Sequence, residues 1–371
     1  MPAVFRSLVL SSTTQPLSQP VAGEAPETYL RQIGWARAWR RAAWRRVAFL
    51  LSGQNRLRLD RIPTSSRRVL WSYFGENQIG DALMDLAARS LLVESGIAVD
   101  LWTSPAIAAL FERDPWFGKV GSEASAFAEI PYDCVLVLSN KNRPLAPKRA
   151  SFPRLPWVSL QESFTGPNFH RGAFAAQRIA DLLGARLTPT ELDRHALQKL
   201  GPIEAGNRAL HADMQGGIAL AVGGVRGDRV YPHWAAVMRQ LAEAGHLRIA
   251  LVGAANGSDQ ARHLVASTQG VALVTDFTGQ LTLGQVRSVL NASAVVACAD
   301  GGLMHLALTT RAPVVALFTA QIAPEWRLPA GSHVQTLRTA EGRVGAIDPL
   351  AVSEAIVRVL AATPPSSDAA P

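Results

Sequence analysis

Short apolar runs of strand length alternate with helix-length segments twice along the chain. The first series has its apolar runs at 68–73, 99–104, 132–139 and 157–160. The second has them at 217–224, 248–254, 272–279, 294–300 and 313–318. Runs that are apolar throughout are typical of parallel strands buried on both faces, with helices as the crossovers. The pattern therefore predicts an α/β fold with two doubly wound parallel-sheet domains that face a cleft.

The intervening segments have the length and periodicity of helices. They lie at about 79–95, 105–113, 170–183, 232–245, 258–268, 282–292 and 302–311. The basic, proline-rich stretch 140–156 is expected to be a long loop, and the mixed stretch 185–215 a connection between domains.

Four domain-level segments follow from this pattern. Residues 1–66 form a flexible N-terminus and a basic helix, and 67–205 form the first domain. Residues 216–345 form the second domain, and 346–371 form a helix that packs back toward the first domain before a disordered tail. A chain of 371 residues is long enough for two domains with full cores.

Composition describes a globular protein: 48% of the residues are hydrophobic and 18% are charged. No apolar run approaches the roughly 18–20 residues needed to span a bilayer. The two cysteines, Cys134 and Cys298, fall inside apolar runs. They are expected to be small core residues in a reducing compartment, which predicts a cytoplasmic location.

The net charge of +8 is concentrated in one segment. Residues 31–68 contain eleven arginines and a single acid, Asp60, so this segment carries +10 and the remainder about −2. Because the body of the protein is nearly neutral, general binding of nucleic acid is not predicted.

The basic segment includes an expected helix at about 28–52 with an amphipathic arrangement. One side collects apolar residues: Trp35, Trp39, Ala42, Ala43, Phe49 and Leu50. The other collects arginines: Arg37, Arg40, Arg41 and Arg45; Arg46 and Trp44 break the pattern. Two interpretations stay open. Residues 30–51 lie on an anionic membrane surface, or the helix packs on the protein's own body.

The stretch 294–318 carries the clearest functional pattern. An apolar run ends at Asp300-Gly301-Gly302, a helix containing His305 follows, and a second apolar run begins at 313. Ligands bind at the carboxyl ends of strands in open α/β sheets, and glycines let the backbone approach a ligand closely. The alternative is an ordinary turn in which Asp300 caps its helix.

A second acidic residue follows the first apolar run. Gly75, Glu76 and Asn77 form a polar loop, and Gly80 and Asp81 open the next helix. Asp81 is suited to act as a general base, because a carboxylate is ionised at neutral pH and can accept a proton from a hydroxyl. The alternative is a simple helix-start aspartate favoured by the helix dipole.

The second series opens with a glycine-rich loop that carries two cations, Arg226 and Arg229. Guanidinium groups can bind a diphosphate without a metal ion. A similar small, polar loop, residues 253–259, follows the next apolar run. The sequence shows no metal-ligand spacing, so no metal is expected at the site.

Three segments together resemble glycosyltransferase family 9, the lipopolysaccharide heptosyltransferases. Residues 277–318 are similar to the family's G-x-T-S-L segment, its D-[ST]-G-x-x-H-[LI]-A helix and its P-V-V-A-L-[FY] strand. IGDALMDLAARSLL resembles the family's G-D helix, and VRGDRVYPHW resembles its R-x-x-K-x-W-P segment. The matches follow the family's order over most of 68–318.

The resemblance implies a GT-B arrangement of two Rossmann-like domains and an inverting transfer of a heptose-type sugar. The donor would be an ADP-sugar, and the acceptor a hydroxyl of a lipopolysaccharide core-like or lipid-linked glycan. No cofactor is implied, and the location would be cytoplasmic or peripheral on the inner face of the inner membrane.

The resemblance also implies roles for individual residues. Asp81 lies at the family's catalytic base, with Gly75, Glu76, Asn77 and Gly80 on the acceptor side. The donor side is a larger set: Arg226, Arg229, Asp259, Asp300, Gly301, Gly302 and His305. The chain departs from the family pattern at three positions. Gly301 stands where the family has Ser or Thr, Arg229 where it has Lys, and Tyr231 where it has Trp.

Two other functions fit the same architecture. A nucleotide-sugar epimerase would release product from a UDP-sugar without an acceptor. A catalytically silent, membrane-docked protein would bind the nucleotide-sugar and transfer nothing.

Overall fold

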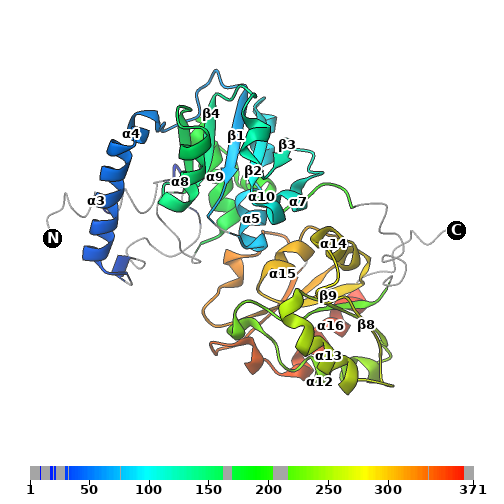
Figure 1. The fold of residues 1–371 in the computed structure, drawn as a ribbon. Coiled ribbons are helices and arrows are strands. Elements are labelled where there is room, and N and C mark those ends of the chain that lie inside the picture. Colours follow the sequence, from blue (N-terminus) through cyan, green and yellow to red (C-terminus); the bar gives the residue numbers. More distant parts are fainter. Residues whose placement is uncertain are drawn as a thin grey trace. The chain divides into compact units, whose positions relative to one another are not determined.

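The structure, a computed structural model of the chain, divides into two compact units (Figure 1). One unit comprises Met1–Gly201 with Glu325–Ala330, and the other comprises Pro202–Pro324 with Gly331–Pro371. The residues that the structure describes are 9, 17–19, 21, 30–31, 33–75, 77–161, 169–203, 216–332 and 334–362.

The first unit contains a five-stranded sheet in the order β3-β2-β1-β4-β5, with all neighbouring strands parallel. The strands are β1 (Arg68–Tyr73), β2 (Ala98–Thr103), β3 (Phe117–Gly121), β4 (Cys134–Ser139) and β5 (Trp157–Gln161). Four of them confirm the predicted apolar runs. The strand β3 was not predicted because its sequence, FGKVG, is short and only partly apolar.

The helices of this unit depart from the prediction in several places, including the short unpredicted helix α4. The helices are α3 (Trp35–Leu51), α4 (Gln54–Leu57), α5 (Ile79–Asp85), α6 (Arg89–Glu94), α7 (Pro105–Phe111), α8 (Asn142–Ser151), α9 (Arg171–Leu183) and α10 (Pro189–Ala196). The expected helix at 79–95 is interrupted by a turn between α5 and α6. The expected loop at 140–156 contains α8, whose Pro144 lies in the first turn, where a proline is tolerated. The expected connection contains α10, which begins with a capping box at Thr188.

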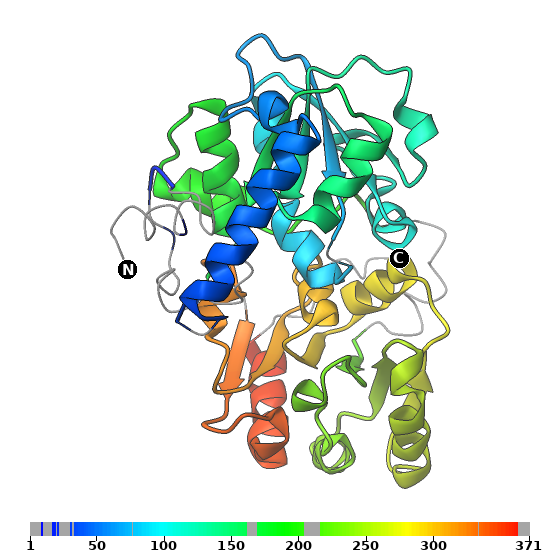
Figure 2. The same ribbon diagram turned by 60° about the vertical axis from the view of Figure 1, so that its left-hand side comes forward.

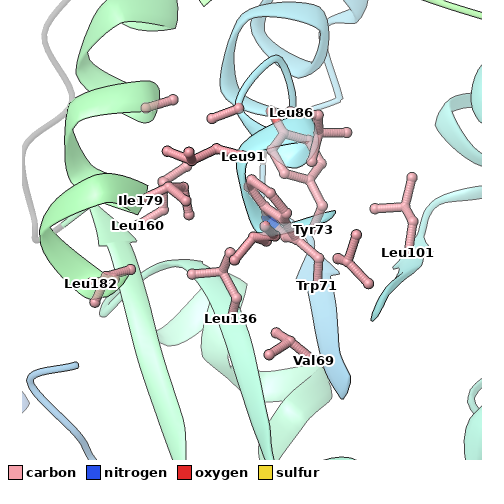
Figure 3. Packing of buried hydrophobic residues seen from close by; sticks show 14 of the residues in the cluster. Val69, Trp71, Tyr73, Leu86, Leu91, Leu101, Leu136, Leu160, Ile179 and Leu182 are labelled. Carbon is pink, nitrogen blue, oxygen red and sulfur yellow. The ribbon is translucent and has the colours of Figure 1, made fainter. Parts of the chain in front are cut away.

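Alternate residues of the sheet supply two separate cores. Val69, Trp71 and Tyr73 of β1 belong to the cluster that also contains Ile179 of α9. Figure 3 shows these side chains packed together with leucines from the neighbouring strands and helices. Leu70 belongs to the cluster on the other face of the sheet. This alternation follows from the period of two along a strand.

The second unit contains a six-stranded parallel sheet in the order β11-β10-β9-β6-β7-β8. The strands are β6 (Ile218–Ala221), β7 (Arg248–Val252), β8 (Leu273–Asp276), β9 (Val295–Ala299), β10 (Val314–Phe318) and β11 (Val334–Arg338). The helices are α12 (Trp234–Glu243), α13 (Ser258–Ser267), α14 (Leu283–Ala292), α15 (Gly302–Ala307) and α16 (Pro349–Ala362). The two Rossmann-like parallel-sheet domains are therefore confirmed.

The C-terminal helix corrects one expectation. Residues 346–371 were expected to pack back toward the first domain, but α16 buries Val352, Ala355 and Ile356 in the core cluster of the second unit. It packs beside α12 and along β9, β10 and β11. Its apolar positions lie on one side of the helix and are buried within its own unit, which explains this placement. The expected disordered tail lies outside the described residues.

The N-terminal helix α3 joins the first unit through its last turns. Phe49 belongs to the core cluster of Leu70 and Trp157, and its ring meets the Trp157 ring edge-on at 5.6 Å. Ala38 and Ala42 are buried on the same side of the helix. Figure 2 shows α3 as one continuous helix. Packing on the protein body is therefore part of its role.

Both cysteines are unpaired and buried, Cys134 in β4 and Cys298 in β9. Burial raises the pKa of the Cys134 thiol to about 12, so it is protonated at neutral pH. Both are core residues, as predicted.

Candidate active site

In the first sheet, β1 and β4 are neighbours although two strands separate them in the sequence. Such a switch point is where open α/β sheets bind ligands. The loop after β1 carries Gly75, whose φ of 107° disfavours any other residue. A Cβ at Gly75 would lie 2.6 Å from Cγ of Pro144 in α8. Glycine therefore lets the loop after β1 touch the helix that follows β4.

The other acceptor-side residues fall on this loop and on α5. Asn77 is exposed, and Gly80 is buried inside α5. Glu76 lies outside the described residues. Asp81 lies in the first turn of α5, and no side chain caps that helix. Asp81 therefore does not cap α5, but it lies in the first turn, where the helix dipole favours an acidic residue.

Asp81 forms an ion pair with Arg171, the first residue of α9. Arg171 Nη1 lies 2.9 Å from Oδ1 of Asp81, and the Asp81 side chain keeps 28% of its surface exposed. The carboxylate is thus held by one oxygen while part of it remains accessible, as a base that meets a substrate requires.

The guanidinium of Arg171 also binds a second carboxylate, that of Asp85. Arg171 Nε and Nη2 donate to Oδ1 and Oδ2 of Asp85, each at 2.6 Å. The Tyr73 hydroxyl donates to Asp85 Oδ2 at 2.9 Å, and Gln161 Nε2 donates to Oδ1 at 3.1 Å. Asp85 is fully buried, so these four donors replace its hydration.

Burial governs the proton affinities in this cluster. It raises the pKa of the Asp85 carboxyl, and the paired Arg171 opposes that change. Burial and the nearby Asp85 raise the pKa of Tyr73 well above its usual value. Tyr73 therefore remains a protonated donor at any physiological pH.

In the second sheet the switch point lies between β6 and β9. The loop after β6 carries Arg229, and Asp300 directly follows β9. Arg229 Nη1 lies 3.1 Å from Asp300 Oδ2, and Asp300 is only 3% exposed. Arg229 Nε is buried and has no hydrogen-bond partner within the described part of the chain. The structure thus brings these two predicted residues together.

Arg226 is placed differently from Arg229. Its side chain is 64% exposed and forms a bidentate pair with Asp228, with both N–O distances 3.0 Å. This pairing lowers the pKa of the Asp228 carboxyl. A donor phosphate would have to compete with Asp228 for Arg226.

The turn after Asp300 is less constrained than its glycines suggest. Gly301 has a φ of 175°, which is extended backbone open to any residue. A Cβ at Gly301 would meet its nearest neighbour, Ala299 O, at 3.8 Å. Gly302 begins α15, and His305 of that helix is 3% exposed. The N-cap position belongs to Gly301, so Asp300 does not cap α15.

Asp259 lies in the first turn of α13, where its side chain is 92% exposed and pairs with Arg262. The neighbouring Gln260 points the other way. Its Oε1 accepts from the Gly223 N–H at 2.9 Å, and its Nε2 donates to Tyr231 O at 2.7 Å. Gln260 therefore orders the glycine loop after β6, a role that the sequence pattern did not predict.

That glycine loop packs directly on the loop after β7. A Cβ at Gly223 would lie 2.6 Å from Gly257 Cα, and Gly223 has a φ of 75°. Asn256 Nδ2 also donates to Gly224 O at 2.9 Å. The backbones of the two loops therefore form one surface beside Arg229.

Sequence reasoning missed Asp85 and Arg171. Asp85 follows Asp81 by four residues on a helix, which places both on one face. That spacing was an available signal. Arg171 is 90 positions away from Asp81, and only the packing of α9 against α5 brings them together.

A family model supplies the deciding comparison: glycosyltransferase family 9 (heptosyltransferase) matches residues 168–344. The chain carries a glycosyltransferase family 9 domain. This family 9 domain includes Arg171 and the whole β6–β10 region with Arg229 and Asp300. Glycosyltransferase activity is therefore assigned to the chain.

Three solved structures are similar to this chain in fold. A family 9 glycosyltransferase from Veillonella parvula is 15% identical with a TM-score of 0.65, over 80% of this chain and 98% of that one. E. coli ADP-heptose LPS heptosyltransferase II is 18% identical with a TM-score of 0.60, over 80% and 98%. E. coli heptosyltransferase WaaC with ADP is 18% identical with a TM-score of 0.59, over 79% and 99%. No curated protein matches the sequence.

Two further observations concern only the described residues. None of the helices there combines the length and apolar character that crossing a membrane demands. The His, Cys, Asp and Glu side chains there form no group of three or more that could hold a metal ion.

Proposed function

We propose that this family 9 enzyme transfers a heptose-type sugar from an ADP-sugar to a hydroxyl of a lipopolysaccharide core-like glycan, with inversion and without metal. The observation that carries the proposal is the Arg229–Asp300 pair at the β6/β9 switch point, inside the matched family region. The names of the similar E. coli structures, an ADP-heptose heptosyltransferase and an enzyme with ADP, support the choice of donor.

Cationic and backbone groups would bind the donor diphosphate. Arg229 Nε is a buried donor without a hydrogen-bond partner among the described residues, and the Gly301 and Gly302 amides lie beside Asp300. Arg226 would add charge when it leaves Asp228. Asp259 is the least favourable of the proposed donor residues, because its carboxylate is exposed and paired with Arg262.

Asp81 would act as the general base. The acceptor oxygen attacks the anomeric carbon, its proton passes to Asp81, and the bond from that carbon to the diphosphate oxygen breaks to release ADP. The electron pair of the broken bond stays on the diphosphate, where arginines stabilise the added charge. One displacement at that carbon inverts its configuration, so no covalent enzyme intermediate is needed.

The test is ADP release from ADP-heptose in the presence of core-type glycan acceptors. Transfer should need the acceptor, survive EDTA, and fall about 10²–10⁴-fold in Asp81→Asn, the range of general-base catalysis. Binding of ADP by this variant should equal that of the wild type. Full activity of Asp81→Asn would disprove the role of Asp81 as general base. Absence of transfer by the wild type would disprove the proposed donor or acceptor.

The same assay separates the two alternatives. An epimerase would change a UDP-sugar with no acceptor present. A silent binding protein would bind the nucleotide-sugar and give no product with any acceptor.

Membrane association is the second part of the proposal, and the exposed face of α3 supports it. Trp44, Val47 and Leu51 repeat at spacings of three and four and are 74%, 44% and 85% exposed. Arg37 and Arg40 continue this row toward the start of the helix, and both are exposed. The helix has no acidic residue. Apolar side chains flanked by arginines suit the interface of an anionic bilayer.

This outward row differs from the face expected from sequence. Ala42 and Phe49, expected on the membrane side, are buried, whereas Trp39 and Leu50 from that side are exposed. Trp44, which broke the predicted pattern, is exposed as well. The proposed location is therefore the cytoplasmic face of the inner membrane, reached through Trp44, Val47 and Leu51.

Sedimentation with phosphatidylglycerol vesicles tests this part. Replacing Trp44, Val47 and Leu51 together with serine should abolish binding, and phosphatidylcholine vesicles should bind poorly. A matched control replaces Val271 and Leu273, which are also exposed, with serine and should bind normally. Equal binding by both variants would disprove the proposed face.

A further inference from the structure

Arg171 and Asp85 both occupy the helix ends that disfavour their charge. Arg171 begins α9, where the helix dipole repels a cation, and Asp85 ends α5, where it repels an anion. Asp85 is also fully buried. Buried ion pairs seldom stabilise a fold more than apolar residues of similar size would. Stability alone therefore gives no reason for this pair.

The geometry of the guanidinium gives another reason. Its Nε and Nη2 edge is committed to Asp85, and Nη1 is left to meet Asp81 Oδ1 at 2.9 Å. Asp85 is in turn held by Tyr73 from β1 and Gln161 from β5. Asp81 is thus connected to the central sheet through one planar, fully anchored group.

We propose that Arg171, whose charge is balanced by Asp85, is a positioning residue that fixes the carboxylate of the general base Asp81. This inference rests on the proposed function, because it concerns the base of that same reaction. Arg171 itself touches Asp81 and is not proposed to touch the reacting atoms.

The charge balance explains why two carboxylates share one arginine. The +1 of Arg171 is largely neutralised by the −1 of Asp85, so Asp81 is oriented by a nearly neutral pair. An unbalanced arginine at 2.9 Å would weaken Asp81 as a proton acceptor. The other described groups of this cluster are the Tyr73 hydroxyl and the Gln161 amide, both uncharged at neutral pH.

Two substitutions should move the pH–rate profile in opposite directions. Asp85→Asn leaves the positive charge of Arg171 without its buried counter-ion. The acid limb of the pH–rate profile of kcat should therefore move to lower pH. Arg171→Gln leaves two carboxylates without a cation, so the acid limb should move to higher pH. Both should lower kcat about 10–100-fold through misplacement of the base, with the KM for the donor unchanged.

Arg89→Gln is the matched control. Arg89 forms another buried pair in the same unit, with Asp114 Oδ2 at 2.5 Å. Loss of the Arg89–Asp114 pair should lower the melting temperature. The acid limb of the pH–rate profile, measured on the enzyme that remains folded, should not move. Arg171→Lys keeps the charge and loses the planar fork. It should fold and show a lower kcat with a small shift of the profile, so the test remains if Arg171→Gln does not fold.

The outcomes distinguish this inference from the proposed function. Transfer by the wild type, loss in Asp81→Asn, and unmoved profiles in both Arg171 and Asp85 variants would overturn the positioning role alone. Shifts of both profiles in the same direction would also overturn it. Absence of transfer by the wild type would overturn the proposed function instead.

Discussion

Arg229 reaches from the loop after β6 to Asp300 at the end of β9, where Nη1 and Oδ2 are 3.1 Å apart. The two strands are neighbours only because the sheet order reverses there. The reversal brings Arg229 to Asp300, which lies 71 positions further along the chain and which the sequence pattern predicted as a site residue.

The first prediction contrasts the two arginines of this loop. Arg229→Gln should weaken ADP binding about 10–100-fold, because a charge-assisted hydrogen bond contributes roughly 1.5–3 kcal/mol. Arg226→Gln should weaken it less, since Arg226 is exposed and already paired with Asp228. Arg229→Lys should retain most of the affinity. Calorimetry with ADP measures all three, and a larger loss in Arg226→Gln would reverse the assignment.

The second prediction concerns Gly301, where a side chain has room. Gly301→Ser should leave the melting temperature nearly unchanged, because its Cβ would have no contact closer than 3.8 Å. The added hydroxyl restores the type of residue usual in the family and should tighten ADP binding by up to about tenfold. Weaker binding would show that the site requires the bare backbone.

The third prediction concerns Gly75 and Pro144. Gly75→Ala should cost about 1–3 kcal/mol in the free energy of unfolding, from its positive φ and from the clash at 2.6 Å. Pro144→Ala removes the clashing Cγ and should rescue part of the loss. Gly245→Ala, at a φ of 87° with nothing within 4 Å, isolates the backbone contribution. Equal losses at the two glycines would exclude a role for the Pro144 contact.

The fourth prediction follows from Lys148, which is fully buried and donates to Gln54 Oε1 at 2.6 Å. Burial lowers the pKa of Lys148 from 10.5 to about 8. Between these values the unfolded chain holds the extra proton, so the free energy of unfolding should rise with pH in that window. The gain is at most about 3 kcal/mol.

Lys148→Met removes this titration while keeping the length of the side chain. Thermal unfolding at about pH 7.5 and about pH 10 should therefore show a smaller rise in the variant than in the wild type. Parallel curves for the two proteins would mean that Lys148 keeps its proton in the folded state across this range.

The sequence allowed the parallel sheets to be predicted because fully buried strands such as β1 and β4 are continuous apolar runs. The edge strand β11 was not predicted because its sequence, VQTLR, is about half polar. The helix α8 was not predicted because proline-rich sequence is typical of loops, although Pro144 fits a first turn.

For the site, local motifs identified Asp81, Arg229 and Asp300, because each follows a strand and a glycine turn. They could not identify Arg171, which depends on how α9 packs against α5. Nor could they show that Gln260, rather than Asp259, turns toward the glycine loop. Side-chain direction at a helix start depends on neighbours from other elements, which a single sequence does not contain.

The short segment Glu325–Ala330 has a consequence for how the two halves are joined. It belongs to the first unit, where Leu328 O bonds to His170 Nε2 at 3.0 Å. The backbone consequently passes from one unit to the other three times. A cut after Gly201 would leave the C-terminal piece with six residues, Glu325–Ala330, that belong to the first unit.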